Sequence, residues 1–521
     1  MKYRKRVASV IALVSFMGLL FTSCEQYQKN STHQHVSDGS IEMGKQLAAM
    51  YCQSCHLLPD PSLLDTKSWG KGVLPMMGPM LGIFNYGYET YPSYKYDHDL
   101  GEGFYPSQPV LTGPQWQSIL DYYTALSPDT LDANKNDVAI GTGLSLFSAV
   151  IPPVSYDSAH TCFAGFDSVM YPGTLVIGDV NKKFVVRFNN QLQPIDSFKI
   201  INPVVDIDFK KDSAVTANIG VIIPNNGRYG SGHKLITSAT QKMNYSQEPM
   251  FDSLRRPVQI TAADFNKDGR NDCLVCEYGN LRGALSWMEN LGNNKFERHV
   301  LREVPGAIKA YVRDYNKDGL PDIYVLFAQA DESIFLYTNK GNGNFEEKRL
   351  LRFPPCYGST YFELADFNKD GFDDIVYSCG DNADFSRVLK PYHGVYIYTN
   401  DGRNNYTQQY FFHINGCFKA MARDFDNDGD LDIASISFFA DYSSRPEEGF
   451  VYLQNNGRFN FRPYNIPEAN KGRWLTMDAG DVDGDGKIDL VLGNFSAPGM
   501  IKSPVQFEKG PPFLLLKNTG R

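Results

Sequence analysis

The sequence lacks the short motifs that mark several classes of enzyme. It contains no Gly-rich phosphate loop, no nucleophile elbow and no His-Glu-x-x-His zinc motif. Acidic residues also outnumber basic ones: the sequence has 50 Lys and Arg and 59 Asp and Glu, which gives a net charge of −9. That balance excludes the basic surface that a nucleic-acid-binding protein needs. Five histidines have no metal-ligand spacing and receive no role: His160, His233, His299, His393 and His413.

The first residues carry export signals. Four basic residues within the first six positions precede an apolar stretch, 7–21, which is too short and too early for a membrane-spanning helix. We therefore expect a signal peptide over residues 1–23. The small residues before Cys24 resemble a bacterial lipobox, whose cysteine is lipidated; ordinary cleavage beside a chance cysteine is the alternative. The resemblance implies an exported bacterial lipoprotein on the outer membrane, with a lipid anchor and polar tether over residues 24–38.

The most specific chemistry lies in Cys52-Gln53-Ser54-Cys55-His56. Two cysteines that bracket two residues, followed at once by histidine, form the attachment sequence of c-type haem. Each thiol adds to one haem vinyl group, and the adjacent imidazole lies under the iron as the proximal ligand. A bare Cys-x-x-Cys also occurs in zinc sites and redox dithiols, but nothing nearby completes a zinc site. We therefore predict one covalent haem c, bound by Cys52, Cys55 and His56.

The distal haem ligand is predicted in the segment from Val73 to Met80. Thioether sulfur is a common distal ligand, and the segment holds Met76, Met77 and Met80. Its prolines and glycine favour an extended, non-helical loop. We favour Met77, because Met-Gly after a Pro turn resembles the distal loops of small bacterial cytochromes. His98 is the rival ligand, and a surface histidine is the alternative interpretation for it.

Two helices are predicted on either side of these ligands. Apolar residues recur at helical spacing over residues 41–51, immediately before the Cys-x-x-Cys-His stretch. Thr112 can cap a second helix that has Pro114 in its first turn. Two such helices packed across a haem edge resemble the class I cytochrome c fold. The resemblance implies a small all-α domain over residues 39–130.

Six further cysteines remain, and an oxidising compartment permits disulfides among them. Cys273 and Cys276 lie three apart in a predicted strand, so they should face opposite sides and not bond each other. The other four are Cys162, Cys356, Cys379 and Cys417. We expect some of the six to be buried apolar residues.

A polar linker, residues 131–150, leads to a self-similar array. Five copies of Asp-x-Asn/Asp-x-Asp-Gly-x-x-Asp follow at separations of 50, 52, 58 and 57 residues, beginning at Asp264, Asp314, Asp366, Asp424 and Asp481. Each copy precedes an apolar strand. Each repeat also carries Asn-x-Gly after an aromatic-rich strand, at Asn290, Asn339, Asn400, Asn455 and Asn518. Two landmarks that recur five times in fixed order identify a repeat array.

The Asp-rich loops are predicted to bind about five Ca²⁺ ions. Oxygen ligands at alternate positions of a tight loop converge on one point, and glycine at the sixth position permits the sharp turn. In the first copy the ligands would be Asp264, Asn266, Asp268, the carbonyl of Arg270, and Asp272. The other copies place these roles at Asp314, Asn316, Asp318, Asp322, Asp366, Asn368, Asp370, Asp374, Asp424, Asp426, Asp428, Asp432, Asp481, Asp483, Asp485 and Asp489. Position twelve lacks the glutamate of an EF-hand, and strands follow in place of helices.

These repeats resemble the FG-GAP/VCBS repeats of integrin-like β-propellers, in which calcium pins a loop of each blade. The resemblance implies an all-β propeller over residues 151–521. Seven blades would take 53 residues each, with eroded, calcium-free copies at 176–181 and 205–208; six or eight blades are the alternatives. The chain ends without a trailing strand after its last repeat. The last blade should therefore borrow a strand from the start of the array and close the ring.

The whole chain resembles bacterial exported lipoproteins that fuse a monohaem cytochrome c to a calcium-binding propeller. We thus expect a multidomain protein in which a small all-α class I cytochrome c domain precedes the propeller. The first hypothesis is a membrane-anchored carrier of single electrons that serves a redox partner protein, with the propeller as scaffold or docking module. The second is a dehydrogenase whose propeller passes substrate electrons to the haem. The third is a surface adhesion lipoprotein whose propeller binds a glycan or a protein.

Overall fold

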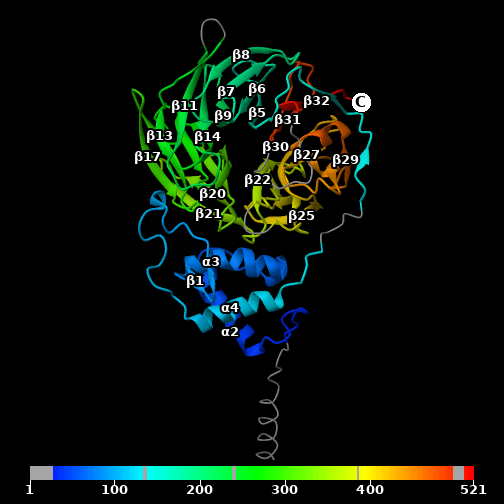
Figure 1. The fold of residues 1–521 in the computed structure, drawn as a ribbon. Helices are drawn as coiled ribbons and strands as arrows, with labels where there is room; N and C mark the ends of the chain where they lie inside the picture. The colour runs from blue at the N-terminus through cyan, green and yellow to red at the C-terminus, as the bar shows by residue number, and fades with distance from the viewer. Residues whose placement is uncertain (1–26, 133–137, 238–241, 384–386, 497–509, 521) are drawn as a thin grey trace, which may run out of the picture.

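The computed structural model describes residues 27–132, 138–237, 242–383, 387–496 and 510–520. A helical region, residues 27–132, lies against one side of a seven-bladed β-propeller (Figure 1). No helix in these described ranges is both long and apolar enough to cross a membrane. The expected signal peptide, residues 1–23, and the expected lipidation site, Cys24, lie outside the described residues.

The helical region contains three α-helices, and both longer ones have the capping residues that start a helix. Its elements are α2 (Asp38–Tyr51), α3 (Leu74–Met80), α4 (Gly113–Leu126), the π-helix η3 (Ser68–Val73), the 3-10 turns η1 (Cys52–Ser54), η2 (Pro61–Leu63) and η4 (His98–Leu100), and a ribbon of β1 (Asn85–Tyr86) and β2 (Glu89–Thr90). The Ser37 side chain accepts a hydrogen bond from the Ser40 amide at the start of α2. At the start of α4, the Gln115 side chain accepts one from the Thr112 amide at 2.9 Å. Both predicted helices are confirmed.

Helices α2 and α4 cross in close contact at Gly44. A Cβ atom at this position would lie 1.9 Å from the backbone oxygen of Ser118, so only glycine fits the crossing. The two helices share one hydrophobic core, whose most buried members are Ile41, Ala48, Leu64, Trp69, Trp116, Ile119, Tyr123 and Ala125. This core positions the end of α2, where the Cys-x-x-Cys-His segment begins.

The methionine segment is helical, and the expectation of an extended loop is wrong. The π-helix η3 continues directly into α3. Pro75 lies at the junction of η3 and α3, where it cannot donate a hydrogen bond to the preceding turn, and Pro79 lies in the last turn. Gly78 allows the ring of Tyr91 to pack on the helix, since a Cβ atom there would lie 2.5 Å from that ring. Tertiary packing therefore overrides the local preference of this sequence.

The segment before α2 packs on the helical core, so the expected tether over residues 24–38 is not free where the structure describes it. Asn30 bonds the C-terminal end of α4, with its amide 2.9 Å from the Ala125 carbonyl and its side chain 2.9 Å from the Ser127 carbonyl. The last carbonyls of a helix lack hydrogen-bond donors within the helix, and Asn30 supplies donors to those of α4. Val36 is also buried in the core.

Seven sheets form the blades of the propeller. Blade one contains β5 (Thr161–Asp167), β6 (Thr174–Asp179), β7 (Phe184–Phe188) and β8 (Pro194–Lys199). Blade two contains β9 (Val204–Phe209), β10 (Ser213–Asn218), β11 (Gly230–Thr237), β12 (Met243–Tyr245) and β13 (Phe251–Leu254). Blade three contains β14 (Pro257–Ala263), β15 (Asp272–Glu277), β16 (Ala284–Gly292) and β17 (Lys295–Arg302), and blade four contains β18 (Ala307–Arg313), β19 (Asp322–Phe327), β20 (Ser333–Asn339) and β21 (Phe345–Arg352).

The last three blades complete the ring. Blade five contains β22 (Ser359–Ala365), β23 (Asp374–Cys379), β24 (Gly394–Asn400) and β25 (Tyr406–His413). Blade six contains β26 (Cys417–Arg423), β27 (Asp432–Ser437), β28 (Phe450–Asn455), β29 (Phe461–Asn465) and the parallel strand β3 (Gly141–Thr142). Blade seven contains β30 (Trp474–Gly480), β31 (Asp489–Asn494), β32 (Phe513–Asn518) and β4 (Phe147–Val150). The prediction of seven blades is confirmed.

Strand β4 closes the propeller from the other end of the array. It pairs antiparallel with β32, in a register that places Phe147 opposite Asn518 and Val150 opposite Leu515. This pairing confirms the predicted borrowed strand, and it removes the open edge of blade seven. The segment 131–150, expected to be a linker, therefore contributes β3 and β4 to the propeller.

The two expected eroded copies are not loops equivalent to the other five. Asp179 ends β6, the second strand of blade one, and Asp208 lies within β9, the first strand of blade two. The corresponding turn of blade one starts at Asp167, whose carboxylate accepts hydrogen bonds from the Val169 and Met170 amides at 3.1 and 2.7 Å. Residues 176–181 thus include most of the second strand of blade one, whereas residues 205–208 lie on the first strand of blade two and lead into the turn between β9 and β10.

The helical region docks on the face of the propeller opposite the Asp-rich loops. Its hydrogen bonds go to connections between second and third strands: Asp97 to Asn226 (2.8 Å), Asp99 to Tyr229 (2.9 Å), and the Leu63 carbonyl to Tyr392 (2.9 Å). The Asp-rich loops join first to second strands, which places them at the other end of each up-and-down sheet. Figure 1 shows the helices on one side of the ring.

The cysteines of the propeller are unpaired within the described residues. Cys273 and Cys276 lie on β15 and enter different hydrophobic clusters, on opposite faces of the strand, as predicted. Cys162, Cys379 and Cys417 are also buried, in line with a role as small apolar side chains. Cys356 differs from these, because it packs against the core of the helical region.

Candidate functional site

The Cys52–His56 segment continues from the last turn of α2. The 3-10 turn η1 begins at Cys52, and the Cys55 amide lies 3.5 Å from the Cys52 carbonyl. Cys52 is half-buried and Cys55 is exposed, and neither forms a disulfide in the described chain. Burial raises the pKa of the Cys52 thiol to about 11, with Cys55 adding a smaller effect. Both sulfurs thus lie unbonded within one turn, as thioether attachment to one porphyrin edge requires.

His56 is held in the tautomer that a metal ligand needs. Its Nδ1 atom lies 2.9 Å from the Leu57 carbonyl oxygen. Because a carbonyl can only accept, Nδ1 carries the proton and Nε2 keeps its lone pair. Burial lowers the pKa of His56, and this effect outweighs the opposing hydrogen bond to Leu57. The imidazole is therefore neutral, and its Nε2 has no hydrogen-bond partner among the described residues, so the three residues fit covalent haem.

The candidate distal ligands lie in two different places. Met77, on α3, packs half-buried against the same hydrophobic core as Cys52. Met76 and Met80 are half-buried on the same helix. His98 lies on η4, between two aspartates that bond the propeller. The structure brings Met77 and Cys52 to one core and leaves His98 at the interface between the helical region and the propeller.

The Asp-rich loops of blades three to seven share one tight geometry. In the first loop, the Asp264 carboxylate accepts hydrogen bonds from the Asp268 and Gly269 amides at 3.1 and 2.9 Å. The sixth-position glycines have left-handed φ angles from 82° to 94°, at Gly269, Gly319, Gly371, Gly429 and Gly486. An L side chain is strained in that conformation, so the predicted need for glycine is confirmed.

The ninth-position aspartates join each loop to the Asn-x-Gly turn of the same blade. Asp322 is fully buried, and its carboxylate accepts hydrogen bonds from the Tyr315 and Asn339 amides at 3.3 and 2.7 Å. The same aspartate-to-asparagine bond, at 2.7 or 2.8 Å, recurs at Asp272–Asn290, Asp374–Asn400, Asp432–Asn455 and Asp489–Asn518. Burial raises the pKa of Asp322. The two landmarks of the repeat are therefore one hydrogen-bonded unit.

Two of the loops gather three carboxylates each within 4.8 Å: Asp424 with Asp426 and Asp428, and Asp481 with Asp483 and Asp485. The Oδ1 atoms of Asp424 and Asp483 are buried and have no hydrogen-bond partner among the described residues. A buried carboxylate oxygen without a donor is destabilising. A hard divalent cation with oxygen ligands would satisfy these atoms, so both loops fit Ca²⁺.

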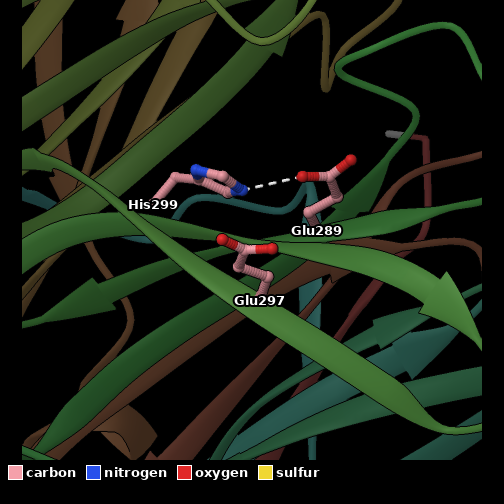
Figure 2. Close-up of side chains that lie close together, drawn as sticks. All are labelled: Glu289, Glu297 and His299. Atoms are coloured by element: carbon pink, nitrogen blue, oxygen red, sulfur yellow. Dashed lines mark hydrogen bonds and ion pairs between the residues drawn. The ribbon is translucent and has the colours of Figure 1, made fainter.

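A further group of candidate metal ligands lies on the β16–β17 hairpin, where Figure 2 shows Glu289, Glu297 and His299. The spacing of His299 in the sequence indicates no metal site; the structure brings it together with two glutamates, because the register of the hairpin pairs Glu289 with Glu297. His299 Nε2 lies 2.7 Å from Glu289, and its ring stacks on Trp287 with centroids 4.5 Å apart. Glu289 also accepts a hydrogen bond from Asn266 at 2.9 Å. These contacts account for the arrangement, and we assign no metal to it.

Comparison with known proteins identifies the repeats. Residues 264–325, 314–377 and 424–492 match the FG-GAP-like repeat family, and each match begins at an Asp-rich loop. The chain contains FG-GAP-like repeats. It is also broadly similar to the N-terminal domain of Nup159, at 11% identity and a TM-score of 0.42, over 74% of this chain and 99% of that chain. The periplasmic gluconolactonase PpgL of Pseudomonas aeruginosa is 10% identical with a TM-score of 0.40, over 58% of this chain and 85% of that chain.

Proposed function

We propose that the protein is a membrane-anchored c-type cytochrome that transfers single electrons, with its FG-GAP propeller as scaffold or partner-docking module. The observation that carries the proposal is the free Nε2 of His56, fixed by the Leu57 carbonyl beside two unbonded cysteines. Cys52 and Cys55 would hold the haem by thioether bonds, and His56 would bind its iron through Nε2. Bound haem c would supply a one-electron Fe(III)/Fe(II) couple.

Met77 is the distal ligand that we propose. It shares a hydrophobic core with Cys52, and core packing restricts the side chain of a ligand before iron binds. Thioether ligation also raises the reduction potential of a haem relative to two imidazoles. A redox partner protein would then exchange electrons with a carrier held at the outer membrane through Cys24.

We propose that calcium ions stabilise the propeller at the five Asp-rich loops. Each loop contains three or four carboxylates, two of the loops gather three of them within 4.8 Å, and the buried, unpartnered oxygens of Asp424 and Asp483 favour a cation there. The ligands would be the first, third, fifth and ninth side chains and the seventh carbonyl of each loop. Because the ninth aspartate also bonds the Asn-x-Gly turn, ion binding would tighten both loops at one end of a blade.

A dehydrogenase is the second candidate, and polar side chains on the inner strands favour it. Tyr311 and Tyr361 share a hydroxyl hydrogen bond of 2.8 Å, and the Lys419 ammonium lies 4.7 Å from the Tyr361 ring centroid. Burial lowers the pKa of Lys419 to about 8, so this amine can act as a base near neutral pH. Reduction of the haem by sugars or alcohols, abolished in Lys419→Met, would support this function over simple electron transfer.

A pyridine haemochrome spectrum of the purified, exported protein tests the main proposal. The expected result is a c-type spectrum that corresponds to one haem per chain. The double variant Cys52→Ala, Cys55→Ala should lose it, whereas Gln53→Ala, at an exposed position between the two cysteines, should keep it. A wild-type protein without a haem spectrum, produced in cells that mature other c-type cytochromes, would contradict the proposal.

A further inference from the structure

Asp331 binds three arginines at the edge of blade four. It lies in the connection between β19 and β20, and its carboxylate contacts Arg302 at 3.2 Å, Arg349 at 2.6 Å and Arg352 at 2.9 Å. Glu347 is the second carboxylate of the group, 2.9 Å from Arg302. We refer to these five residues as the Asp331 cluster. Three cations face two carboxylates, so the cluster carries an excess positive charge.

The charges of the cluster are held in place by packing. The guanidinium groups of Arg302 and Arg349 lie 4.4 and 5.1 Å from the ring centroid of Phe335. The Phe353 amide donates to the Glu332 carbonyl at 2.8 Å, which ties the end of β21 to the loop that carries Asp331. The Asp331 side chain is only 14% exposed. Water therefore screens its ion pairs less than those of a surface pair.

The cluster lies on the propeller face that carries the helical region. Cys356, four residues after Arg352, packs against the hydrophobic core that Cys52 also contacts. Four residues of extended chain span at most about 14 Å, so Arg352 lies close to that contact. Tyr357, the residue after Cys356, stacks on the ring of Tyr392 with centroids 4.6 Å apart, and the Tyr392 hydroxyl donates a hydrogen bond to the Leu63 carbonyl at 2.9 Å. The Asp331 cluster therefore lies beside the part of the propeller that contacts the helical region, where Cys52 packs on the same hydrophobic core as Cys356.

We propose that the Asp331 cluster sets the reduction potential of the haem held by Cys52, Cys55 and His56. This inference rests on the proposed function. Oxidised haem iron carries one more positive charge than reduced iron, so a neighbouring cation favours the reduced state and a neighbouring anion favours the oxidised state. Arg352 should therefore raise the potential, and Asp331 should lower it. The propeller would thus act on electron transfer through charge, in addition to supporting the helical region.

Potentiometric titration of the haem-loaded, full-length protein tests the proposal. Arg352→Gln should lower the midpoint potential, and Asp331→Asn should raise it. We expect each variant to change the Fe(II)/Fe(III) ratio at fixed potential by on the order of tenfold, about 59 mV for a one-electron couple. Lys340→Gln is the matched control, because Lys340 lies on the same blade in an exposed pair with Glu346, on the opposite face.

The two variants are expected to shift the midpoint potential in opposite directions, so a general loss of structure cannot account for both shifts. Loss of Asp331 leaves three arginines without their shared partner and can loosen the loop, so melting temperatures of all variants should accompany the titrations. Unchanged potentials, or shifts of the same sign in Arg352→Gln and Asp331→Asn, would overturn the inference if each protein still shows one c-type haem. That outcome would leave the proposed cytochrome function intact. A wild-type protein without haem would instead overturn both.

Discussion

The side-chain amide of Asn339 in blade four donates a hydrogen bond to the Phe265 carbonyl in blade three, across 2.9 Å. The equivalent Asn518 of blade seven donates to the Phe425 carbonyl of blade six, across 2.7 Å. The Asn-x-Gly landmark therefore joins neighbouring blades at these two junctions, in addition to bonding the Asp-rich loop of its own blade.

Replacement of Asn339 should destabilise the propeller. In Asn339→Ala, the carbonyls of Phe265 and Pro321 lose their donor in a buried setting. We expect the free energy of unfolding to fall by about 1–3 kcal/mol, measured by urea denaturation. Lys340→Ala, an exposed neighbour in the same turn, is the control and should change it little. Equal stability of Asn339→Ala and Lys340→Ala would show that the inter-blade bond contributes nothing.

Removal of calcium should lower the melting temperature of the whole protein by many degrees. A ligand that binds only the folded state adds to its stability, so chelation withdraws that contribution at five loops together. Asp424→Asn should reduce the response to chelator, because it removes one of the three carboxylates that lie within 4.8 Å of one another in this loop. Asp401→Asn, at an exposed aspartate outside these loops, should respond as the wild type does. If EGTA leaves the melting temperature unchanged, the proposal that calcium stabilises these loops is wrong.

Stability should also depend on pH through Glu448, which is fully buried beside Arg445 and Asn415. Burial raises the pKa of its carboxyl from 4.5 to about 7. The unfolded chain then loses this proton at lower pH than the folded chain, so the free energy of unfolding falls as pH rises from about 4.5 to about 7. Glu448→Gln cannot ionise and should lack this component, which is at most about 3 kcal/mol.

The comparison uses the pH slope rather than the absolute stability, because the variant also loses the ion pair with Arg445. Thermal melts of both proteins across this pH window supply the two slopes. Other titrating groups contribute equally to the pH slopes of the two proteins, so their contributions cancel in the difference between the slopes. Parallel slopes would mean that Glu448 is ionised in the folded protein throughout the window.

Met77→Ala should change the iron ligation of the haem-loaded protein. Loss of a thioether ligand removes the weak absorption near the red end of the Fe(III) spectrum and lowers the reduction potential. Met76→Ala is the control on the same helix, and it should keep the absorption. If the absorption persists in Met77→Ala, another residue is the distal ligand, and Met80 is the next to replace.

The repeat array was predictable because its two landmarks are local and recur. Asp264 and its four equivalents mark the loops, and the missing strand at the chain end predicted the closure that β4 provides. Residues 176–181 and 205–208 lie mainly in strands rather than in Asp-rich loops, so the loops of the first two blades could not be located from this motif. The helix over the methionine segment could not be predicted from the local sequence, because it depends on tertiary contacts such as the packing of Tyr91 on Gly78.

Part of the proposed haem site could likewise be predicted from the sequence, and part of it could not. The motif formed by Cys52, Cys55 and His56 is local in sequence, so it predicts haem attachment without any knowledge of the fold. The contact of Cys356 with the helical core joins residues about three hundred positions apart, and no spacing rule predicts it. The Asp331 cluster was missed for the same reason, because Arg302 and Arg352 come from strands of adjacent blades.

Peptide-resolved mass spectrometry of the mature protein is the most direct test of covalent haem attachment. We predict that the peptide spanning Cys52 to His56 carries the mass of one haem, with both sulfurs in thioether bonds. The peptides that contain the other described cysteines should be unmodified. Free thiols at Cys52 and Cys55, or a disulfide between them, in protein exported by a cell competent for cytochrome c maturation would contradict it.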